Sequence, residues 1–338
     1  MSRALDKDAV VSSQEEASQQ VYLDIVRALS SSPFRRLEIE FLGKGHILLP
    51  GCNILVDENY IGVSKPKLVQ AFVIARKLFF TYLKDMEHVD DQEIRNTTAV
   101  MLLMDAENLT AANTRKRLLQ RCKDSADYES VLSQELIWVE GLLTSPLHRH
   151  SKSPTLWNHR RWLLELGQST KMPYNIHGDL TEVILVSAER HPRNYYAWQH
   201  LRWILLNMYG ESSLNGVVSL DDEKLIAIIL VWCTRHPSDT SGFSFLLFCL
   251  SVLPERTKSR SEVCSSVCRE VLGLANSFHW THESVWVFIR TLVASGAVSE
   301  EQKTYFYASI RAIIRKIGSK QNIVNAEAWC KMNENTCH

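Results

Sequence analysis

The sequence has no excess of either charge, because 38 lysines and arginines balance 38 aspartates and glutamates over 338 residues. Nucleic-acid-binding proteins are usually basic, so this balance argues against general nucleic-acid binding. The longest hydrophobic run, Leu225 to Cys233, is far shorter than the roughly 20 residues that a membrane helix needs. Residues 1–20 are also too polar for a secretory signal. These absences predict a soluble cytoplasmic protein that has no membrane span.

The chain also lacks a Cys-x-x-Cys pair, a glycine-rich phosphate loop, a nucleophile elbow and a paired-histidine zinc motif. Its eight cysteines, among them Cys337, stand mostly in apolar helical contexts, which favours reduced thiols over a disulfide framework. Cys264 and Cys268 are four residues apart on an expected helix, and they leave a zinc site as a weak alternative. The residues alone therefore indicate a protein-binding chain and disfavour a self-sufficient enzyme.

The first part of the chain, residues 1–89, differs in pattern from the rest. It predicts a helix from about residue 14 to 30 that is broken at Pro33, and a second helix over about 67–86. Residues 34–63 hold several glycines and only short apolar runs. They predict an extended loop, with a short hairpin as an option. Residues 90–338 form a separate second part in this interpretation.

From residue 90 onward one pattern recurs, and it is clearest around Trp198. Large or apolar anchor residues recur every 41 to 45 positions: Ala112, Trp157, Trp198, Phe243, Trp286 and Trp329. Four residues before five of these anchors stands a residue type that favours helix N-caps: Asn108, Ser153, Asn194, Asp239 and Asn325. Each unit therefore predicts two helices joined by a short turn, the second helix beginning just before the anchor.

The first helices are expected at 91–104, 128–143, 179–190, 221–235, 260–277 and 299–317, and the second at 109–121, 155–167, 195–209, 240–252, 283–295 and 324–332. One such pair cannot bury its apolar face alone, so neighbouring pairs must stack. The prediction is an all-α fold, a crescent-shaped, right-handed α-solenoid of antiparallel helical hairpins. It consists of five repeats and a degenerate C-terminal cap repeat.

Histidines recur seven residues before four anchors, at His150, His191, His236 and His279. A shared metal site is one interpretation. It is disfavoured because adjacent helices lie roughly 8–10 Å apart, too far for one ion to collect ligands from several units. Interaction of each histidine with the dipole at a helix C-terminus is the favoured interpretation.

Arginines follow the anchors by three or four residues: Arg115, Arg160, Arg161, Arg202 and Arg290. Pairing between repeats is the favoured role for them, and ligand contact is the alternative. Arg193 differs because it lies in a turn immediately before the N-cap Asn194. A basic side chain and the exposed N–H groups of a helix start could both meet an anion there. An ordinary solvated arginine fits the sequence equally well.

Two units carry a specific resemblance: Asn194-Tyr195-x-x-Trp198-x-His200-x-Arg202-Trp203 and Pro154-x-x-Trp157-Asn158-x-Arg160-Arg161-Trp162. Both resemble the repeat of the protein prenyltransferase α subunits, as does the later segment His282-Glu283-Ser284-x-Trp286. The resemblance covers about residues 90–332. The N-terminal segment and the degenerate first and fourth units are most similar to the branch of this family that serves type III geranylgeranyltransferase.

The resemblance implies an α subunit that wraps a separate β subunit of the Rab geranylgeranyltransferase type. The β subunit is expected to hold zinc and the isoprenoid, and this chain to bind no cofactor itself. Together they would transfer a geranylgeranyl group from its diphosphate to a C-terminal cysteine of a protein substrate. Related α subunits contact the diphosphate through a lysine before the Asn-Tyr pair, and Arg193 stands at that position here.

The resemblance also suggests residues of the concave face that would meet a partner: Tyr195, Tyr196, His200, Arg160 and Arg202. The fourth unit departs from the family pattern, because Phe243 replaces the anchor tryptophan and no arginine follows it. The alternative function is therefore a non-enzymatic α-solenoid adaptor that binds a protein on its concave face.

Overall fold

The computed structural model describes residues 2–31, 34–43, 45–46, 48–85, 88–209, 222–252 and 260–333. Within these ranges the chain is mostly helical, and it divides into two compact units, Met1–Val218 and Ser219–His338. The boundary expected at residue 89 stays a prediction. Three sequence-based expectations concern residues outside the described ranges. They are the helix break at Pro33, the helix start at residue 221 and the reduced thiol of Cys337.

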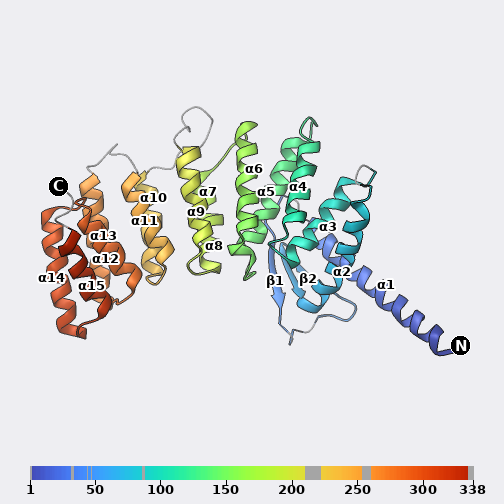
Figure 1. Ribbon diagram of the computed structural model, residues 1–338, viewed down its shortest axis with the longest axis horizontal. Helices are drawn as coiled ribbons and strands as arrows, with labels where there is room; N and C mark the ends of the chain where they lie inside the picture. Colours follow the sequence, from blue (N-terminus) through green and yellow to red (C-terminus); the bar gives the residue numbers. More distant parts are fainter. Residues whose placement is uncertain are drawn as a thin grey trace. The chain divides into compact units, whose positions relative to one another are not determined.

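The first unit begins with a long helix, a small sheet and a second helix, and antiparallel helical hairpins follow (Figure 1). Its elements are α1 (Ser2–Ser30), β1 (Glu38–Leu42), β2 (Leu55–Asp57), β3 (Tyr60–Ser64), α2 (Lys65–Tyr82), α3 (Asp91–Met104), α4 (Leu109–Arg121), α5 (Tyr128–Thr144), the 3-10 turn η1 (His150–Lys152), α6 (Pro154–Ser169), α7 (Ile176–Asp179), the π turn η2 (Leu180–Ile184), α8 (Leu185–Arg190), α9 (Tyr195–Ile204) and the π turn η3 (Leu205–Tyr209).

The second unit repeats the hairpin pattern with helices alone in its described part. These are α10 (Asp222–Arg235), α11 (Thr240–Val252), α12 (Arg260–Phe278), α13 (Glu283–Ala294), α14 (Glu300–Ile317) and α15 (Gln321–Asn333). No helix in the described ranges combines the length and the apolar character that crossing a membrane would require.

The anchors and caps of the first five repeats behave as the sequence predicts. The anchor side chains Ala112, Trp157, Trp198, Phe243 and Trp286 are each at most 3% exposed. The cap side chains Asn108, Ser153, Asn194 and Asp239 each accept a hydrogen bond from the backbone N–H three residues on, at 2.8–3.3 Å. Each cap satisfies a helix N–H that would otherwise lack a partner. The all-α solenoid of stacked hairpins is thereby confirmed, while its handedness and curvature stay predictions.

The extended loop expected over residues 34–63 is instead a three-stranded sheet in the order β1-β3-β2. The optional hairpin is present as the antiparallel pair of β2 and β3, whereas β1 joins β3 in parallel. The loop prediction overlooked an alternating pattern at the start of β1. Leu37 and Ile39 are buried there, and Glu40 between Ile39 and Phe41 is exposed. That alternation is typical of a strand with one buried face.

The sheet docks on α5 through close backbone contact (Figure 1). A Cβ atom at Gly141 would lie 3.0 Å from the carbonyl oxygen of Leu37, so glycine permits this approach. Beside it, Ser145 Oγ accepts a hydrogen bond from the Ile39 N–H at 2.8 Å. The segment at residues 35–39 is therefore held against the first hairpins, where it forms one wall of a groove described below.

The sixth repeat does not follow the predicted register. Helix α15 begins at Gln321, so Asn325 lies inside it and is not a cap. Its buried residues are Ile323, Ala326 and Cys330, while Trp329 is only half-buried. Trp329 was aligned with the anchors because of its size, but the smaller residues form the buried face of the helix.

The third hairpin is longer than expected on its first side. Its first helix begins at Ile176, not at residue 179, and passes through the π turn η2 before α8. Its second helix ends in the π turn η3. These wider turns are inserted without an obvious sequence signal such as proline, and the helical periodicity expected over 195–209 holds only through Ile204.

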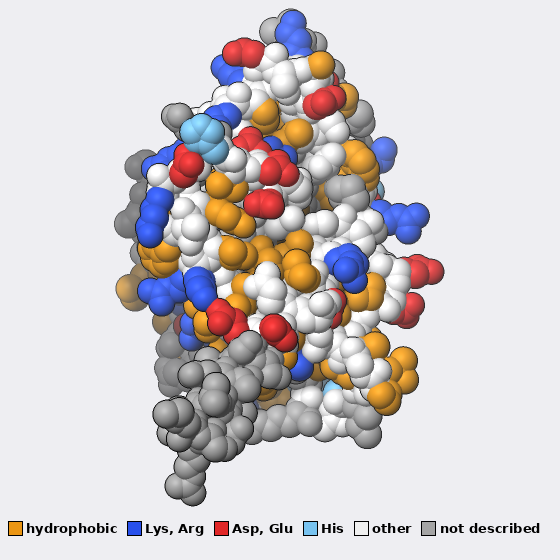
Figure 2. Space-filling view, turned by 90° about the vertical axis from the view of Figure 1, so that its right-hand side faces the viewer, with side chains coloured by type: hydrophobic (Ala, Val, Ile, Leu, Met, Phe, Trp, Pro, Cys, Tyr) orange, Lys and Arg blue, Asp and Glu red, His pale blue; other side chains and the backbone are white. Residues whose placement is uncertain are grey.

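Figure 2 shows the face of the molecule at its N-terminal end. Hydrophobic side chains lie there among side chains of both charges, without one dominant sign. The exposed hydrophobic residues of α2 include Val69, Val73 and Phe80. A balanced surface of this kind agrees with the zero net charge of the chain.

Candidate functional site

The turns between paired helices are joined to one another by the capping side chains. Ser153 Oγ donates a hydrogen bond to the carbonyl oxygen of Ala106, in the preceding turn, at 3.0 Å. Asn194 Nδ2 donates to Ser151 O, again one turn earlier, at 2.6 Å. In the second unit a residue that is not a cap makes a similar link: Asn322, at the start of α15, donates from Nδ2 to Thr281 O at 2.9 Å. Each linked residue thus ties its turn to the preceding one and fixes the spacing of the turns.

Arg193 occupies a strained position in the third of these turns. Helix α8 ends at Arg190, the following His191 has an extended backbone, and Arg193 follows Pro192 with a φ of 59°. For a residue other than glycine this left-handed conformation costs about 1–2 kcal/mol. The neighbouring Asn194 is fully buried and also donates to Ser187 O at 3.2 Å, which holds the turn in place. Strain maintained by its surroundings is a pointer to function.

Further basic residues lie in the turn that holds Arg193 and in the preceding turn, which Asn194 bonds through Ser151. We define the basic turn cluster as His148, Arg149, Lys152, His191 and Arg193, of which all but the half-buried His191 are exposed. The rings of His148 and His191 meet edge to face with centroids 5.1 Å apart. Burial first, and then the charges of Lys152 and His148, lower the pKa of His191. The cationic side chains of the cluster, Arg149, Lys152 and Arg193, are the groups that could attract an anion.

The predicted face residues fall into two groups. Tyr195 is 58% exposed and Tyr196 is half-buried, and their rings stand 5.6 Å apart beside Arg193. Arg202 is half-buried. Arg160 and His200 are instead only 1% and 5% exposed, so in this chain they are interior residues and their placement on the partner face is corrected.

Arg160 lies at the centre of a buried ion network that connects two neighbouring hairpins. Its Nη2 atom lies 2.8 Å from Glu140 Oε1 of α5 and also pairs with Asp179 of α7. Its Nη1 atom donates to His200 Nε2 of α9 at 2.6 Å. Burial alone lowers the pKa of Arg160, but the Asp179 and Glu140 carboxylates outweigh it and raise that pKa above its ordinary value. Arg160 is therefore fully charged and paired between repeats.

A second network repeats this arrangement one hairpin earlier. Arg115 of α4 makes a bidentate pair with Glu135 of α5, at 2.7 Å from Nε and 2.6 Å from Nη2. His159 Nε2 also lies 2.9 Å from Glu135 Oε1. Burial raises the pKa of Glu135, but Arg115 and His159 outweigh burial and hold it well below its usual range. The predicted pairing between repeats is thus confirmed for Arg115 and Arg160.

The carboxylates of these networks were missed at the sequence level. Glu135 and Glu140 belong to α5, and Asp179 ends α7. The sequence did offer one signal, a carboxylate on an otherwise buried helix face. Such a group is rarely buried without a cationic partner, so it points to an ion pair.

The other predicted arginines make different contacts. Arg161 makes a surface pair with Glu165 at 3.0 Å, and Arg290 lies 5.0 Å from the centroid of the Trp329 ring.

Two of the recurring histidines, His150 and His236, lie within hydrogen-bonding distance of a backbone carbonyl oxygen. His150 Nε2 lies 3.0 Å from Leu102 O, and burial lowers its pKa. His236 Nδ1 lies 2.8 Å from Trp232 O and stacks on the ring of that residue. A lowered pKa disfavours the charged form that the dipole interpretation needs, so that interpretation is wrong for His150 and His191. In the described ranges no group of three or more His, Cys, Asp or Glu residues is placed to hold a metal.

The neutral His200 predicts a loss of stability in acid. Burial, followed by the charges of Arg160 and Arg161, holds its pKa well below 6.5. Near pH 6.5 His200 therefore becomes protonated in the unfolded chain but stays neutral in the folded chain. The free energy of unfolding consequently falls as the pH drops below that value. Urea unfolding should give a free energy about 1 kcal/mol lower at pH 5.5 than at pH 7 from this residue alone. His200→Gln should remove that part of the slope, and an unchanged slope would contradict the assignment.

Comparison with known proteins identifies one of these hairpins. Residues 132–167 match the family model of the protein prenyltransferase alpha subunit repeat. The match spans most of α5, η1 and most of α6, and it holds Glu135, Glu140 and the anchor Trp157. A second model, the ECM9 middle domain, matches residues 156–272. The hairpin of α5 and α6 is hereafter called the prenyltransferase repeat.

Relatives that match about 62% of this chain carry the same repeat name. Protein prenyltransferase alpha subunit repeat-containing protein 1 of Danio rerio is 29% identical over 229 residues, which is 62% of this chain and 50% of that protein. Its counterpart in Homo sapiens is 29% identical over 231 residues, 62% of this chain and 52% of that protein. The chain spans about half the length of these curated relatives.

A solved structure, Candida albicans protein geranylgeranyltransferase-I complexed with GGPP, is similar with a TM-score of 0.48 and 14% identity. The likeness covers 80% of this chain and 84% of that one. Similarity at this level carries no argument about ligand or partner.

Proposed function

We propose that this chain is the α subunit of a heterodimeric protein geranylgeranyltransferase of type III. The observation that carries the proposal is the basic turn cluster, with Arg193 held in a strained conformation beside the prenyltransferase repeat. The similarity to the α-subunit repeat-containing proteins supports the same assignment. The partner is a β subunit of the Rab geranylgeranyltransferase type, and the heterodimer works in the cytoplasm.

In this proposal the chemistry is shared between the subunits. Zinc on the β subunit lowers the pKa of the acceptor cysteine, so that its thiolate is available. A bond forms between that sulfur and the first carbon of geranylgeranyl diphosphate. The bond from this carbon to the diphosphate oxygen breaks, and diphosphate leaves with the electron pair. The protein substrate carries the acceptor cysteine at its C-terminus.

The role of this chain is to bind the leaving diphosphate and to present a surface to the β subunit. Arg193 offers a planar guanidinium that can donate two parallel hydrogen bonds to phosphate oxygens. Lys152 adds a positive charge in this region, which contributes to the lowered pKa of His191. Tyr195, Tyr196 and Arg202 lie nearby and form the expected contact with the β subunit. Preorganised charge at the leaving group favours the transition state over the bound substrate.

A non-enzymatic adaptor is the second candidate. The observation in its favour is the fourth repeat, in which Phe243 replaces the anchor tryptophan and no arginine follows. Co-expression with Rab-type β subunits, purification on a tag of either chain, and a transfer assay with labelled geranylgeranyl diphosphate separate the two. A heterodimer that transfers the label supports the enzyme, whereas failure of every β subunit to co-purify would leave the adaptor.

Substitution of Arg193 gives a sharper prediction. We expect Arg193→Ala to lower kcat of the heterodimer roughly 10- to 100-fold, a loss of about 1.4–2.7 kcal/mol of transition-state binding. Arg193→Gly should lower kcat equally and stabilise the fold slightly, because glycine accepts a φ of 59° without strain. Arg193→Lys should keep part of the activity.

The matched control is Arg311→Ala, at an exposed position of α14 in the second unit. It should change neither assembly nor kcat. If Arg193→Ala and Arg311→Ala gave the same kcat as the unmodified heterodimer, Arg193 would return to the class of ordinary surface arginines.

A further inference from the structure

A polar groove lies between the N-terminal segment and the first hairpins, away from the basic turn cluster. Its deeper hollow has a volume of about 390 Å³ and is lined by α1, α3, α4, α5 and residues 35–37. A neighbouring hollow of about 560 Å³ shares Arg35 and Ile137 with it. The two hollows are therefore neighbours that border on the same two side chains. We call them together the Arg35 groove.

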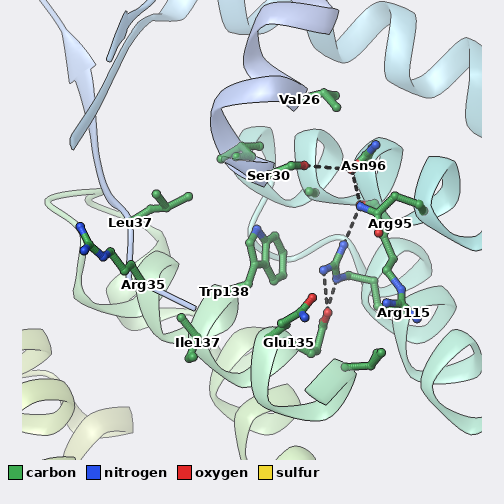
Figure 3. A pocket seen from close by; sticks show the side chains of 15 residues that line it. Val26, Ser30, Arg35, Leu37, Arg95, Asn96, Arg115, Glu135, Ile137 and Trp138 are labelled. Carbon is green, nitrogen blue, oxygen red and sulfur yellow. Dashed lines mark hydrogen bonds and ion pairs between the residues drawn. The ribbon is translucent and has the colours of Figure 1, made fainter. Parts of the chain in front are cut away.

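The deep end of the groove is rigid and already charge-balanced. Arg115 and Glu135 face each other there, and the Trp138 ring stands beside them (Figure 3). The guanidinium carbon of Arg115 lies 3.9 Å from the centroid of that ring. Because each charge of this buried pair already has a partner, neither is available to a ligand without breaking the pair.

Two other arginines of the groove carry a positive charge that no carboxylate pairs with in the described part of the chain. Arg95 is half-buried and Arg35 is exposed, and in the described part of the chain neither guanidinium has a hydrogen bond or an ion pair. They lie on opposite sides of Trp138 (Figure 3). An anionic ligand seated along the groove would meet one arginine at each side.

The rest of the lining has two kinds of surface. Apolar side chains form a continuous wall: Val26, Leu29, Leu37, Val131, Ile137 and Trp138. Amide side chains of Gln92, Asn96 and Gln134 stand on the rim, and Asn96 Oδ1 accepts hydrogen bonds from Ser30 and Gln92 at 3.2 and 2.9 Å. Amide groups of this kind can bond the N–H and C=O groups of an extended peptide.

We propose that the Arg35 groove binds an extended acidic peptide segment of a protein partner. Carboxylate side chains of the segment pair with Arg35 and Arg95, its backbone meets the rim amides, and an intervening apolar side chain packs against Trp138 and Ile137. Arginine favours carboxylates because its planar donors match their two oxygens. Two neighbouring hollows with an arginine on each side of Trp138 suit an extended chain better than a compact small molecule. The site is independent of the proposed transferase function.

The test uses the full chain and short end-blocked, fluorescein-labelled peptides with central Glu-Leu-Glu, Gln-Leu-Gln or Lys-Leu-Lys sequences. Fluorescence anisotropy should detect binding of the Glu peptide, with the Gln peptide at least about tenfold weaker, which corresponds to about 1.4 kcal/mol. The double variant Arg35→Glu with Arg95→Glu should lose the Glu peptide and gain the Lys peptide. Arg311→Glu, in the second unit, is the control and should bind as the unmodified chain does.

Circular dichroism and thermal unfolding of each variant establish that it is folded before binding is measured. Equal affinity for the Glu and Gln peptides, or a double variant that still prefers Glu, would overturn the proposal. Hydrocinnamate serves as a free apolar carboxylate in competition. If it displaced the peptide at an equal concentration, the groove would belong to a free carboxylic acid and the peptide assignment would be wrong.

Discussion

Arg160→Ala is expected to lower the free energy of unfolding by about 3–5 kcal/mol. The guanidinium is 1% exposed and pairs with Glu140 and Asp179 from two different helices. Its removal leaves two carboxylates beside each other in a buried site, where an unpaired charge is costly. It also leaves His200 Nε2 without its donor. Urea or guanidinium unfolding followed by circular dichroism measures the change.

The neighbouring arginine is the matched control. Arg161 is 48% exposed and pairs with Glu165 on its own helix, and its guanidinium lies 4.7 Å from the Trp203 ring centroid. Exposed pairs of this kind contribute little, so Arg161→Ala should cost less than about 1 kcal/mol.

A rescue variant identifies the source of the loss at Arg160. Replacing Arg160 by Met and neutralising its partners with Glu140→Gln and Asp179→Asn should recover more than half of the stability, because no unpaired charge then remains. If Arg160→Ala cost no more than Arg161→Ala, the network would not hold the hairpins together.

Trp198→Ala is expected to cost about 3–5 kcal/mol, because it empties a large volume inside a packed repeat. The Trp198 side chain is 3% exposed and lies on the inner face of α9 with Leu201 and Leu205. Unfolding in urea should show a lower midpoint with little change in slope. The anchor alignment predicts a similar loss for Trp157→Ala, since both tryptophans occupy the same position of the hairpin.

Tyr195 provides the contrast within the same helix. It lies three residues before Trp198 and is 58% exposed, so Tyr195→Ala should change stability by less than about 1 kcal/mol. A neutral Trp198→Ala would overturn the assignment of the anchors to the core. A loss at Tyr195 equal to that at Trp198 would show that the helix face is assigned wrongly.

The substitutions at Arg160 and Trp198 test the scaffold and not the proposed site. Arg160 and Trp198 act in the interior, whereas Arg193 lies exposed in the turn between α8 and α9. The scaffold matters to the site because Asn194, which caps α9, is bonded to Ser151 in the preceding turn. A shift of one hairpin against the next would therefore move Arg193.

Much of the hairpin pattern could be read from the sequence because its signals are local. A cap such as Asn194 bonds an N–H three residues away, and an anchor such as Trp198 lies on the same helix face as the next apolar residues. The predicted register of the sixth repeat was wrong because it also relied on a local signal, the size of one side chain. Trp329 looked like an anchor, but the face that packs belongs to Ile323, Ala326 and Cys330.

The sequence by itself determined the helical hairpins, their caps and the position of Arg193 in a turn, since each depends on residues a few places apart. Only the tertiary structure decided which charges meet. Arg160 reaches Asp179 and His200 across 19 and 40 residues, and β1 pairs with β3 in parallel across the intervening chain. Arg160 and His200 therefore moved from the expected partner surface to the interior, because a buried cation is stable only where the fold brings carboxylates to it. The Arg35 groove likewise exists only where the N-terminal segment packs against α5.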